Sequence, residues 1–155
     1  MVEAASHADS ADSSIVRAVE VIGDRWTVLI LRDAFRGVRR FDELAADLGI
    51  ARNLLSDRLR RLVEQGILQK VPYQERPTRY EYRLTPMGVD LSPALVALMR
   101  WGDKHRSGAA GPPLALVHAT CGHELDQVFL CRHCHEEVTP LGIRSRPGPG
   151  ARSAS

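Results

Sequence analysis

Two short stretches of this sequence carry residues whose types and spacing are suited to chemistry or binding. Residues 48–62 read LGIARNLLSDRLRRL and hold four arginines among regularly spaced leucines. Guanidinium groups are permanently charged and form bidentate hydrogen bonds with phosphates and base edges. Residues 121–134 read CGHELDQVFLCRHC, and thiolates and imidazoles are ligands that zinc prefers. The first stretch therefore suits contact with a polyanion, and the second suits a metal ion.

The arginine-rich stretch predicts a helix from about Arg52 to Gln65 with two different sides. The apolar side, expected to pack on the domain, consists of Leu55, Leu59, Leu62 and Val63. The outward side consists of Asn53, Ser56, Asp57, Arg60 and Arg61. Arg52 lies at the N-terminus, where the helix dipole favours phosphate, and Arg58 lies on the flank as an expected phosphate or surface contact. Asp57 would repel phosphate, so we expect it to orient a neighbouring arginine or to accept a hydrogen bond from cytosine.

An arginine-bearing helix is often only a solvated surface, but its surroundings favour DNA binding. A short helix from Asp42, its expected N-cap, to Gly49 precedes it, and such a helix-turn-helix pair presents its second helix to the major groove. Exposed Arg, Asn and Ser side chains pair with guanine and adenine. A hairpin after the pair is expected to reach phosphates or the minor groove. The remaining predicted DNA contacts are Arg39 and Arg40 before the pair, Arg76 at the hairpin tip and Arg79 at its base.

Hydrophobic periodicity predicts helices before this pair. One helix begins near Ile15 and is broken at Gly23. A second runs from Trp26 to about Gly37. The two are either separate helices or one helix bent at the glycine.

The pattern changes after the arginine-rich helix. Residues 67–71 and 80–84 alternate as strands do, and a long exposed loop over 73–79 is expected to join them. Thr85 with Pro86 then marks the start of another helix, because a hydroxyl caps it and proline fits its first turn. Pro93 should kink or restart that helix.

The composition limits the class of function. A hydrophobic content of 44% supports a packed core, and a net charge of +2 means that any basic surface is local. No apolar run approaches the roughly 20 residues that span a bilayer, and the N-terminus lacks a signal peptide, so we expect a cytoplasmic protein without membrane contact. The three cysteines would be reduced there. The sequence has no P-loop, nucleotide-binding glycine motif or Gly-x-Ser-x-Gly motif, which argues against an enzyme.

Several of these motifs together resemble a known family. The segments IGDRW, RRFDEL, LSDRLRRL and YEYRLT, within a match from Ser13 to Gly102, resemble the HxlR family of bacterial transcription regulators, winged-helix proteins related to the MarR type. The resemblance implies a homodimer on palindromic or near-palindromic operators, with the first helix and the long helix after the wing at the interface. The interface residues are then Ile15, Val19, Ile22, Leu91, Leu95, Leu98, Met99 and Trp101. Intramolecular packing is the alternative for part of this apolar surface.

Two positions depart from the family pattern. Many members carry a cysteine near the N-terminus, and some sense oxidants or electrophiles through it, but this sequence has Ser13 there. A hydroxyl has no accessible thiolate, so that redox switch is absent. Ala51 precedes the recognition helix where many relatives have a capping serine, so we expect Asn53 or water to satisfy part of the helix start.

A small-molecule effector is expected between the dimer helix and the DNA-binding core. The residues that would line this cavity are Trp26, Phe35, Leu98 and Trp101. The alternative for each of them is a plain role in filling the core. An effector that changed the opening of the dimer would change the separation of the recognition helices, and with it the affinity for DNA.

The C-terminal cysteines have the spacing of a structural zinc site. A Cys-x-His pair and a Cys-x-x-Cys pair lie a short loop apart. The expected ligands are Cys121, His123, Cys131 and Cys134, with His133 and His135 as rivals. Four protein ligands leave no open position, so this zinc would be structural and not catalytic. The alternatives are incidental thiols on a flexible tail and a redox pair of Cys131 with Cys134.

We therefore predict a mainly α fold with a small β-hairpin (α+β): a winged helix-turn-helix domain with dimerisation helices and a short C-terminal Cys/His segment. The expected parts are a disordered N-terminus (1–12), the DNA-binding and dimerisation domain (13–106), a linker (107–113), the Cys/His segment (114–143) and a disordered tail (144–155). The expected function is a sequence-specific regulator, by family analogy a repressor, that binds double-stranded DNA. The alternatives are a winged-helix module for protein interaction, or a redox regulator that uses the C-terminal cysteines.

Overall fold

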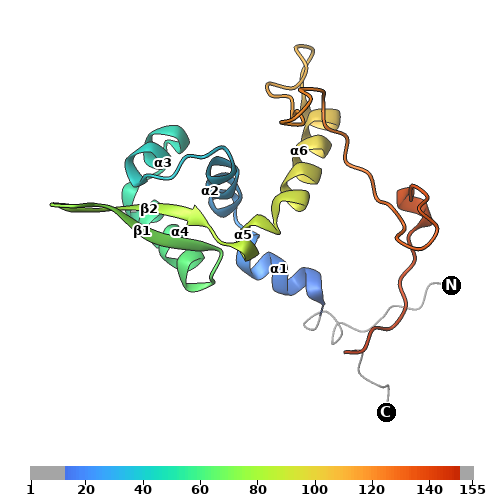
Figure 1. The fold of residues 1–155 in the computed structure, drawn as a ribbon, viewed down its shortest axis with the longest axis horizontal. Helices are drawn as coiled ribbons and strands as arrows, with labels where there is room; N and C mark the ends of the chain where they lie inside the picture. Colours follow the sequence, from blue (N-terminus) through green and yellow to red (C-terminus); the bar gives the residue numbers. More distant parts are fainter. Residues whose placement is uncertain (1–12, 151–155) are drawn as a thin grey trace. The chain divides into compact units, whose positions relative to one another are not determined.

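The computed structural model describes residues 13–150, and it divides into two compact units between Arg100 and Trp101 (Figure 1). The elements are α1 (Ser14–Ile22), α2 (Arg25–Phe35), α3 (Phe41–Leu48), α4 (Arg52–Glu64), β1 (Leu68–Glu75), β2 (Thr78–Leu84), α5 (Pro86–Val89), α6 (Ser92–Arg106) and the 3-10 helix η2 (Pro140–Gly142). The predicted fold class, mainly α with one β-hairpin, is confirmed. Among the described residues, no helix is long and apolar enough to cross a membrane.

The described residues cover only part of the predicted domain organisation. The expected disorder of residues 1–12 lies outside the described residues, and so does that of 151–155. Residues 144–150 form no helix or strand. The linker at 107–113 stays a prediction, because the division between the two units falls inside α6.

The segment before the helix-turn-helix pair forms two separate helices, α1 and α2, which is one of the two possibilities that the sequence left open. Asp24 caps α2: its Oδ1 accepts hydrogen bonds from the backbone N–H groups of Trp26 at 3.1 Å and Thr27 at 3.2 Å. These bonds satisfy two of the donors that a helix start leaves free. A side chain at Gly23 would lie 2.3 Å from the Val19 carbonyl oxygen, so the chain turns at a residue without one.

The helix-turn-helix pair forms α3 and α4. Gly49 ends α3 in the left-handed conformation, with a φ of 58°, as expected for a C-terminal glycine. The expected N-cap was wrong: α3 begins at Phe41, and Asp42 lies inside its first turn. Arg40 takes the cap position, and its backbone N–H donates to Glu43 Oε2 at 3.3 Å. An acidic residue in the first turn stabilises a helix start as one at the cap does, which explains why α3 begins before Asp42.

One hydrophobic cluster holds α2, α3, α4 and the hairpin together. Its buried residues are Ile30, Leu31, Leu44, Ile50, Leu55, Leu59, Leu62, Ile67 and Leu68. The three leucines of α4 are the apolar side that the sequence predicted, with Val63 partly buried beside them. Each large side chain of this kind contributes about 1.5–3 kcal/mol on burial. The cluster therefore fixes which side of α4 faces outward.

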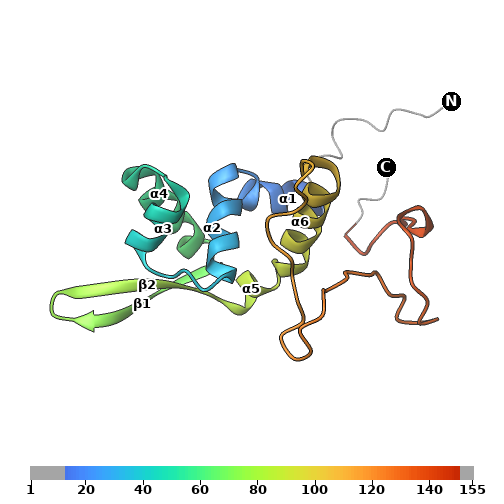
Figure 2. The same cartoon turned by 90° about the horizontal axis from the view of Figure 1, so that it is seen from above.

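The hairpin is longer and its turn tighter than predicted. The antiparallel register runs from Leu68 opposite Leu84 to Glu75 opposite Thr78, so only residues 76–77 form the turn. The expected long loop over 73–79 was therefore wrong, and Arg79 lies beside the tip instead of at the base. The outer half of the hairpin extends past the helices (Figure 2) and is almost wholly exposed, so its alternation leaves no hydrophobic pattern.

A short third strand-like segment joins the hairpin to the helices. The backbone N–H of Tyr82 donates to the Arg39 carbonyl at 2.8 Å, and Arg40 forms an isolated bridge with Glu81. The chain before α3 is thus hydrogen-bonded to β2. This contact places the predicted pair Arg39 and Arg40 next to the wing.

The segment after the hairpin forms a helix at the start that the sequence predicted. Thr85 caps α5 by accepting from the Gly88 N–H at 3.1 Å, and its hydroxyl donates to the Gly66 carbonyl at 2.6 Å. The helix stops at Val89, and α6 restarts at Ser92 with Pro93 in its first turn. The predicted restart at the proline is confirmed.

Candidate nucleic-acid interface

The outward side of α4 carries a group of ion pairs centred on Asp57. Arg60 Nη2 lies 2.7 Å from Asp57 Oδ1, and Arg61 Nε lies 3.1 Å from Asp57 Oδ2. Glu64 Oε1 accepts a further hydrogen bond from Arg60 Nη1 at 3.0 Å. Both arginine side chains are more than 60% exposed, so each can exchange a carboxylate for a phosphate or a base without unpacking. The prediction that Asp57 orients neighbouring arginines is confirmed.

Asp57 and Arg60 hold each other in their charged forms. The hydrogen bond from Arg60 lowers the pKa of the Asp57 carboxyl, desolvation opposes it, and the charges of Arg61 and Arg58 lower the pKa further. The same hydrogen bond raises the pKa of the Arg60 guanidinium. The charges of the two carboxylates, Asp57 and Glu64, and the two exposed guanidinium groups, Arg60 and Arg61, sum to zero. The outward side therefore offers DNA an ordered arrangement of donors and little net attraction.

Arg58 lies on the flank of α4, as predicted, and its side chain is half-buried there. Its side chain is 21% exposed, and its Nε lies 3.1 Å from Asp24 Oδ1 at the start of α2. A second contact joins its Nη1 to Asp57 Oδ2 at 3.3 Å. The flank of α4 that carries Arg58 faces the N-terminus of α2, so the guanidinium contacts carboxylates of the protein there, and a phosphate contact is not favoured.

The other predicted contacts on α4 are exposed. Asn53 and Ser56 lie on its N-terminal half, where a recognition helix meets base edges. Arg52 Nη2 lies 2.8 Å from Asp42 Oδ1, across the turn of the pair. No side-chain hydrogen bond caps the helix at Ala51. The expected help from Asn53 or water at this helix start stays a prediction.

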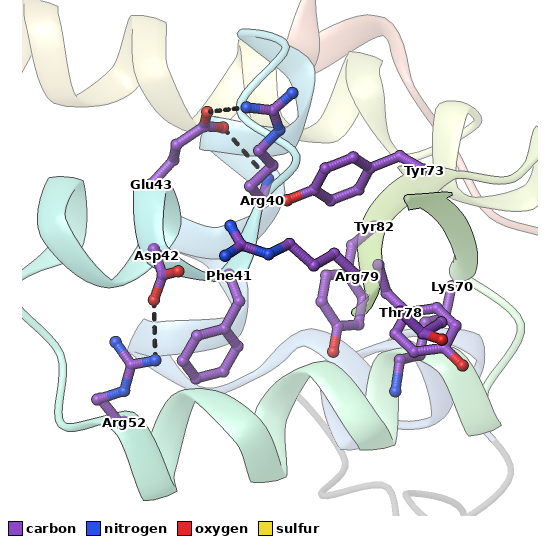
Figure 3. Close-up of a pocket in the computed structure, with 11 residues that line it drawn as sticks. Arg40, Phe41, Asp42, Glu43, Arg52, Lys70, Tyr73, Thr78, Arg79 and Tyr82 are labelled. Atoms are coloured by element: carbon purple, nitrogen blue, oxygen red, sulfur yellow. Dashed lines mark hydrogen bonds and ion pairs between the residues drawn. The ribbon is translucent and has the colours of Figure 1, made fainter. Parts of the chain in front are cut away.

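A cavity of about 470 Å³ opens between the start of α3, the start of α4 and the hairpin (Figure 3). It is lined by Arg40, Phe41, Asp42, Glu43, Arg52, Lys70, Tyr73, Thr78, Arg79, Tyr80 and Tyr82. Figure 3 shows the Arg79 side chain extending from the hairpin toward the start of α3, beside Arg40 and Phe41. Four cations and two carboxylates line the cavity, which leaves it with an excess of positive charge. A phosphate group fits that chemistry.

Aromatic rings hold three of these cations in place. The Arg40 guanidinium lies 4.6 Å from the Tyr73 ring centroid, and the Arg52 guanidinium lies 4.8 Å from that of Phe41. Lys70 Nζ lies 4.2 Å from the ring of Tyr80. Such contacts contribute about 0.5–1 kcal/mol each at exposed sites. The cations are thus ordered before any ligand arrives.

The structure brings some predicted contacts together and leaves others apart. Arg40, Arg52 and Arg79 share the cavity, whereas Arg76 is exposed at the turn of the hairpin. Arg39 is exposed next to the bridge with β2. Sequence reasoning missed the strand residues that complete the cavity, which are Lys70, Tyr73, Thr78, Tyr80 and Tyr82. Alternation of tyrosine with charged residues over 79–83 was the available signal for the β2 residues.

The predicted dimer helices keep much apolar surface exposed. Neither α1 nor α6 has a buried residue, and Ile15 is 73% exposed and Leu98 55% exposed. The other exposed members of the predicted interface are Val19 and Trp101. By contrast, Ile22, Leu91 and Leu95 pack against the core cluster, so the alternative of intramolecular packing applies to them.

Three of the four residues of the predicted effector cavity lie in the first unit, and Trp101 lies in the second. Trp26 packs on the core cluster, with the Arg25 guanidinium 4.9 Å from its ring, which fits the alternative of core filling. Phe35 and Leu98 are exposed at the surface of their helices. Cavities of about 470 and 140 Å³ among residues 13–150 are lined by other residues. An effector site stays a prediction.

The predicted zinc ligands lie in two tight turns of the second unit. Cys121 and Cys134 are exposed and Cys131 is half-buried, and all three are free thiols. His123 Nδ1 lies 3.1 Å from the Cys121 carbonyl oxygen, while His118 Nδ1 lies 3.3 Å from Cys121 Sγ. Within residues 13–150, no three His, Cys, Asp or Glu side chains converge on a metal position. The zinc site stays a prediction, and His118 is a candidate ligand that sequence reasoning missed.

Backbone donors stabilise one of these thiolates. The N–H groups of Cys134 and His133 are directed at the Cys131 sulfur, and together with the Cys134 side chain they lower the pKa of that thiol. A lowered pKa favours metal binding and oxidation alike, because the thiolate is the reactive form in both. The pKa alone therefore does not separate the zinc site from a redox pair.

A tight helix-turn-helix followed by a basic hairpin defines a winged helix-turn-helix DNA-binding protein. A family model described as HxlR-like helix-turn-helix matches residues 21–109, which is more than half of the chain. The chain belongs to this family and is a DNA-binding transcriptional regulator. The resemblance predicted from IGDRW, RRFDEL, LSDRLRRL and YEYRLT is confirmed.

Individual relatives agree with that assignment. An HTH-type transcriptional regulator of Mycobacterium bovis is 52% identical over 140 residues, which cover 90% of this chain and 89% of the relative. The crystal structure of PA1607, described as a transcription factor, superposes with a TM-score of 0.80 at 34% identity and covers 92% of this chain and all of that one. The redox regulator HypR in its reduced form superposes with a TM-score of 0.58 at 29% identity, covering 61% of this chain and 95% of that one.

Proposed function

We propose that this regulator is a homodimeric repressor that binds a near-palindromic operator. The carrying observation is the joint position of two arginine-bearing groups on one domain: the oriented arginines of α4, and the cavity between α3, α4 and the hairpin. α4 would enter the major groove and read bases through Asn53, Ser56 and Arg60. The cavity would hold a backbone phosphate, so that the wing sets the register of α4.

A dimer is favoured by the apolar surface of α1 and α6. Exposed apolar side chains such as Ile15, Val19 and Leu98 lie on helices that the unit itself does not cover. Surface of this kind on a soluble domain commonly marks an interaction site. A two-fold partner would place the second α4 about one DNA turn, ~34 Å, from the first or at a multiple of that distance.

Footprinting on the DNA upstream of the protein's own gene tests the operator. The proposal predicts two protected half-sites related by two-fold symmetry, with centres about one helical turn or a multiple apart. A flat titration at low salt would reject DNA binding to this region and would favour the alternative of a protein-interaction module. Protection that covers the promoter would support repression.

Mass measurement in solution tests the dimer separately. Val19→Asp and Leu98→Asp place a carboxylate in the proposed interface and should yield monomers. Val89→Asp is the matched control, because Val89 is also exposed but lies on α5. A wild-type protein that is monomeric at micromolar concentration, free and bound to DNA, would contradict this part of the proposal.

A further inference from the structure

The second unit contains two turns with the same backbone hydrogen bonds. In the first turn, residues 117–124, the His118 N–H donates to the His123 carbonyl at 2.8 Å. In the second turn, residues 130–137, the Cys131 N–H donates to the Glu136 carbonyl at 2.9 Å. The inner bonds also correspond, from Gly122 N–H to His118 O and from His135 N–H to Cys131 O, each at 2.8 Å.

The ends of the two turns correspond as well. An isolated bridge closes each turn, between Val117 and Glu124 in the first and between Leu130 and Glu137 in the second. The residues after the second ligand position, Gly122 and His135, both have a positive φ, of 73° and 59°. A positive φ is uncommon for a residue other than glycine, so its presence at His135 follows from the shape of the turn.

This correspondence assigns equivalent positions to four ligand-type residues. His118 corresponds to Cys131, and Cys121 corresponds to Cys134, since each pair encloses two intervening residues. Within each turn the two side chains face one another: His118 Nδ1 lies 3.3 Å from Cys121 Sγ, and Cys134 is hydrogen-bonded to Cys131. Tetrahedral zinc with Zn–S and Zn–N bonds of about 2.3 and 2.0 Å separates such ligands by about 3.6 Å. Each turn therefore presents half of a tetrahedral site.

His123 fits this arrangement less well. It corresponds to Glu136, which closes the second turn through its backbone carbonyl. Its own Nδ1 lies 3.1 Å from the Cys121 carbonyl oxygen instead of near a sulfur. The correspondence of the two turns therefore favours His118 as a ligand over His123, which the Cys-x-His spacing suggested.

We propose that the two turns close on one structural zinc ion bound by His118, Cys121, Cys131 and Cys134. The turns are separate in the structure described, so closure requires movement of the connecting residues 125–129, which form no helix or strand. No residue between 101 and 150 is buried, and apolar residues such as Val128 and Phe129 are more than half exposed. A segment that buries so little needs a crosslink to hold one conformation, and in such small segments metal binding drives folding.

This site is independent of DNA binding by the winged helix. The family model ends at residue 109, before either turn begins. A redox pair of Cys131 and Cys134 would account for the second turn and leave the matching first turn unexplained. One zinc site uses all three cysteines of the chain.

The test uses the full chain, purified with reductant and without a metal-binding tag. Elemental analysis should give one zinc per chain, and cobalt(II) substituted for zinc should show the visible spectrum of a tetrahedral site with thiolate charge transfer. His118→Ala should lower zinc affinity more than about 100-fold, beyond the 10–100-fold typical of residues that only support a ligand. His123→Ala is the matched control and should leave affinity and spectrum unchanged.

Three outcomes would overturn the proposal. The reduced protein could fail to bind zinc or cobalt(II) at one ion per chain. If His123→Ala lost the metal and His118→Ala kept it, the fourth ligand would be His123, as the Cys-x-His spacing predicts. A disulfide between Cys131 and Cys134 in the protein purified with reductant would remove both thiols as zinc ligands. None of these readouts depends on DNA, so they leave the proposed operator binding untouched.

Discussion

Arg58 Nε lies 3.1 Å from Asp24 Oδ1, which joins the recognition helix to the N-terminal cap of α2. Asp24 also accepts hydrogen bonds from two backbone N–H groups of α2 and from the Thr27 hydroxyl. The Asp24 carboxylate thus caps the start of α2 and also pairs with Arg58 of α4. Arg58 belongs to the framework of the domain, while Arg60, two residues away, is free to meet a ligand.

Arg58→Ala should therefore destabilise the domain and change DNA binding little. Removing the arginine leaves Asp24 with its backbone donors but without its counter-charge. Because both side chains are partly exposed, we expect a loss of about 1–2 kcal/mol in the free energy of unfolding, measured by urea denaturation. Arg60→Ala is the matched comparison, with an unfolding midpoint close to that of the wild type and weakened binding to DNA. The opposite assignment of the two effects would contradict this division of roles.

The Asp24 carboxyl should also make stability depend on acidity. Partial burial acts to raise its pKa, but hydrogen bonds from Thr27 and Trp26 and the charge of Arg58 outweigh burial and hold the pKa below its ordinary value. A carboxyl with a lowered folded-state pKa stabilises the fold above its unfolded pKa, about 3.9, and loses that contribution as pH falls through the folded value. The urea midpoints of wild type and Asp24→Asn should differ at pH 7 and converge below about pH 4. Equal differences at both pH values would count against this role of Asp24.

Asp57→Asn should make DNA binding stronger and less selective. The substitution removes the carboxylate that Arg60 and Arg61 share, so both guanidinium groups gain freedom to pair with any phosphate. In fluorescence anisotropy, affinity for unrelated DNA should rise and the slope of log K against log salt should steepen by about 0.9. The ratio of operator to unrelated DNA affinity should fall. A variant that keeps both the wild-type slope and the wild-type ratio would show that Asp57 does not restrain these arginines.

Some of this interface follows from the sequence alone, and the reason is burial. Leu55, Leu59 and Leu62 repeat with helical period because they pack on one core, and their phase places Asn53 and Arg60 outward. The same phase places Arg58 on a flank, as the structure does, but it does not indicate what that flank contacts. Whether a flank meets solvent or another helix depends on tertiary packing.

The hairpin and the Cys/His segment show a second limit. Thr78 and Arg79 lie in a strand whose faces are both exposed, so hydrophobic alternation ends before the strand does and predicts a loop there. In the Cys/His segment, spacing along the chain favours His123, whereas the structure places His118 beside Cys121. Backbone geometry decides which of two nearby histidines faces a thiol, and the spacing of residues along the chain does not show that geometry.

Arg79→Ala should weaken binding to all DNA sequences alike. Arg79 lines the cavity with Arg40 and Arg52, where we expect a phosphate and not a base. Loss of one phosphate contact should reduce the salt slope by about 1 and leave sequence preference unchanged. Arg144→Ala is the charge-matched control, since this exposed arginine lies outside the residues that the family model matches. A change in sequence preference would mean that Arg79 reads bases.

The central claim is that α4 binds DNA through its outward arginines. The most direct measurement is the affinity of the purified full-length protein for DNA from its own upstream region, compared between wild type and the Arg60→Ala, Arg61→Ala double variant at several salt concentrations. We expect tight, salt-sensitive binding by the wild type, and loss of both affinity and sequence preference in a double variant that remains folded. Equal affinity of the two proteins for that DNA would contradict it.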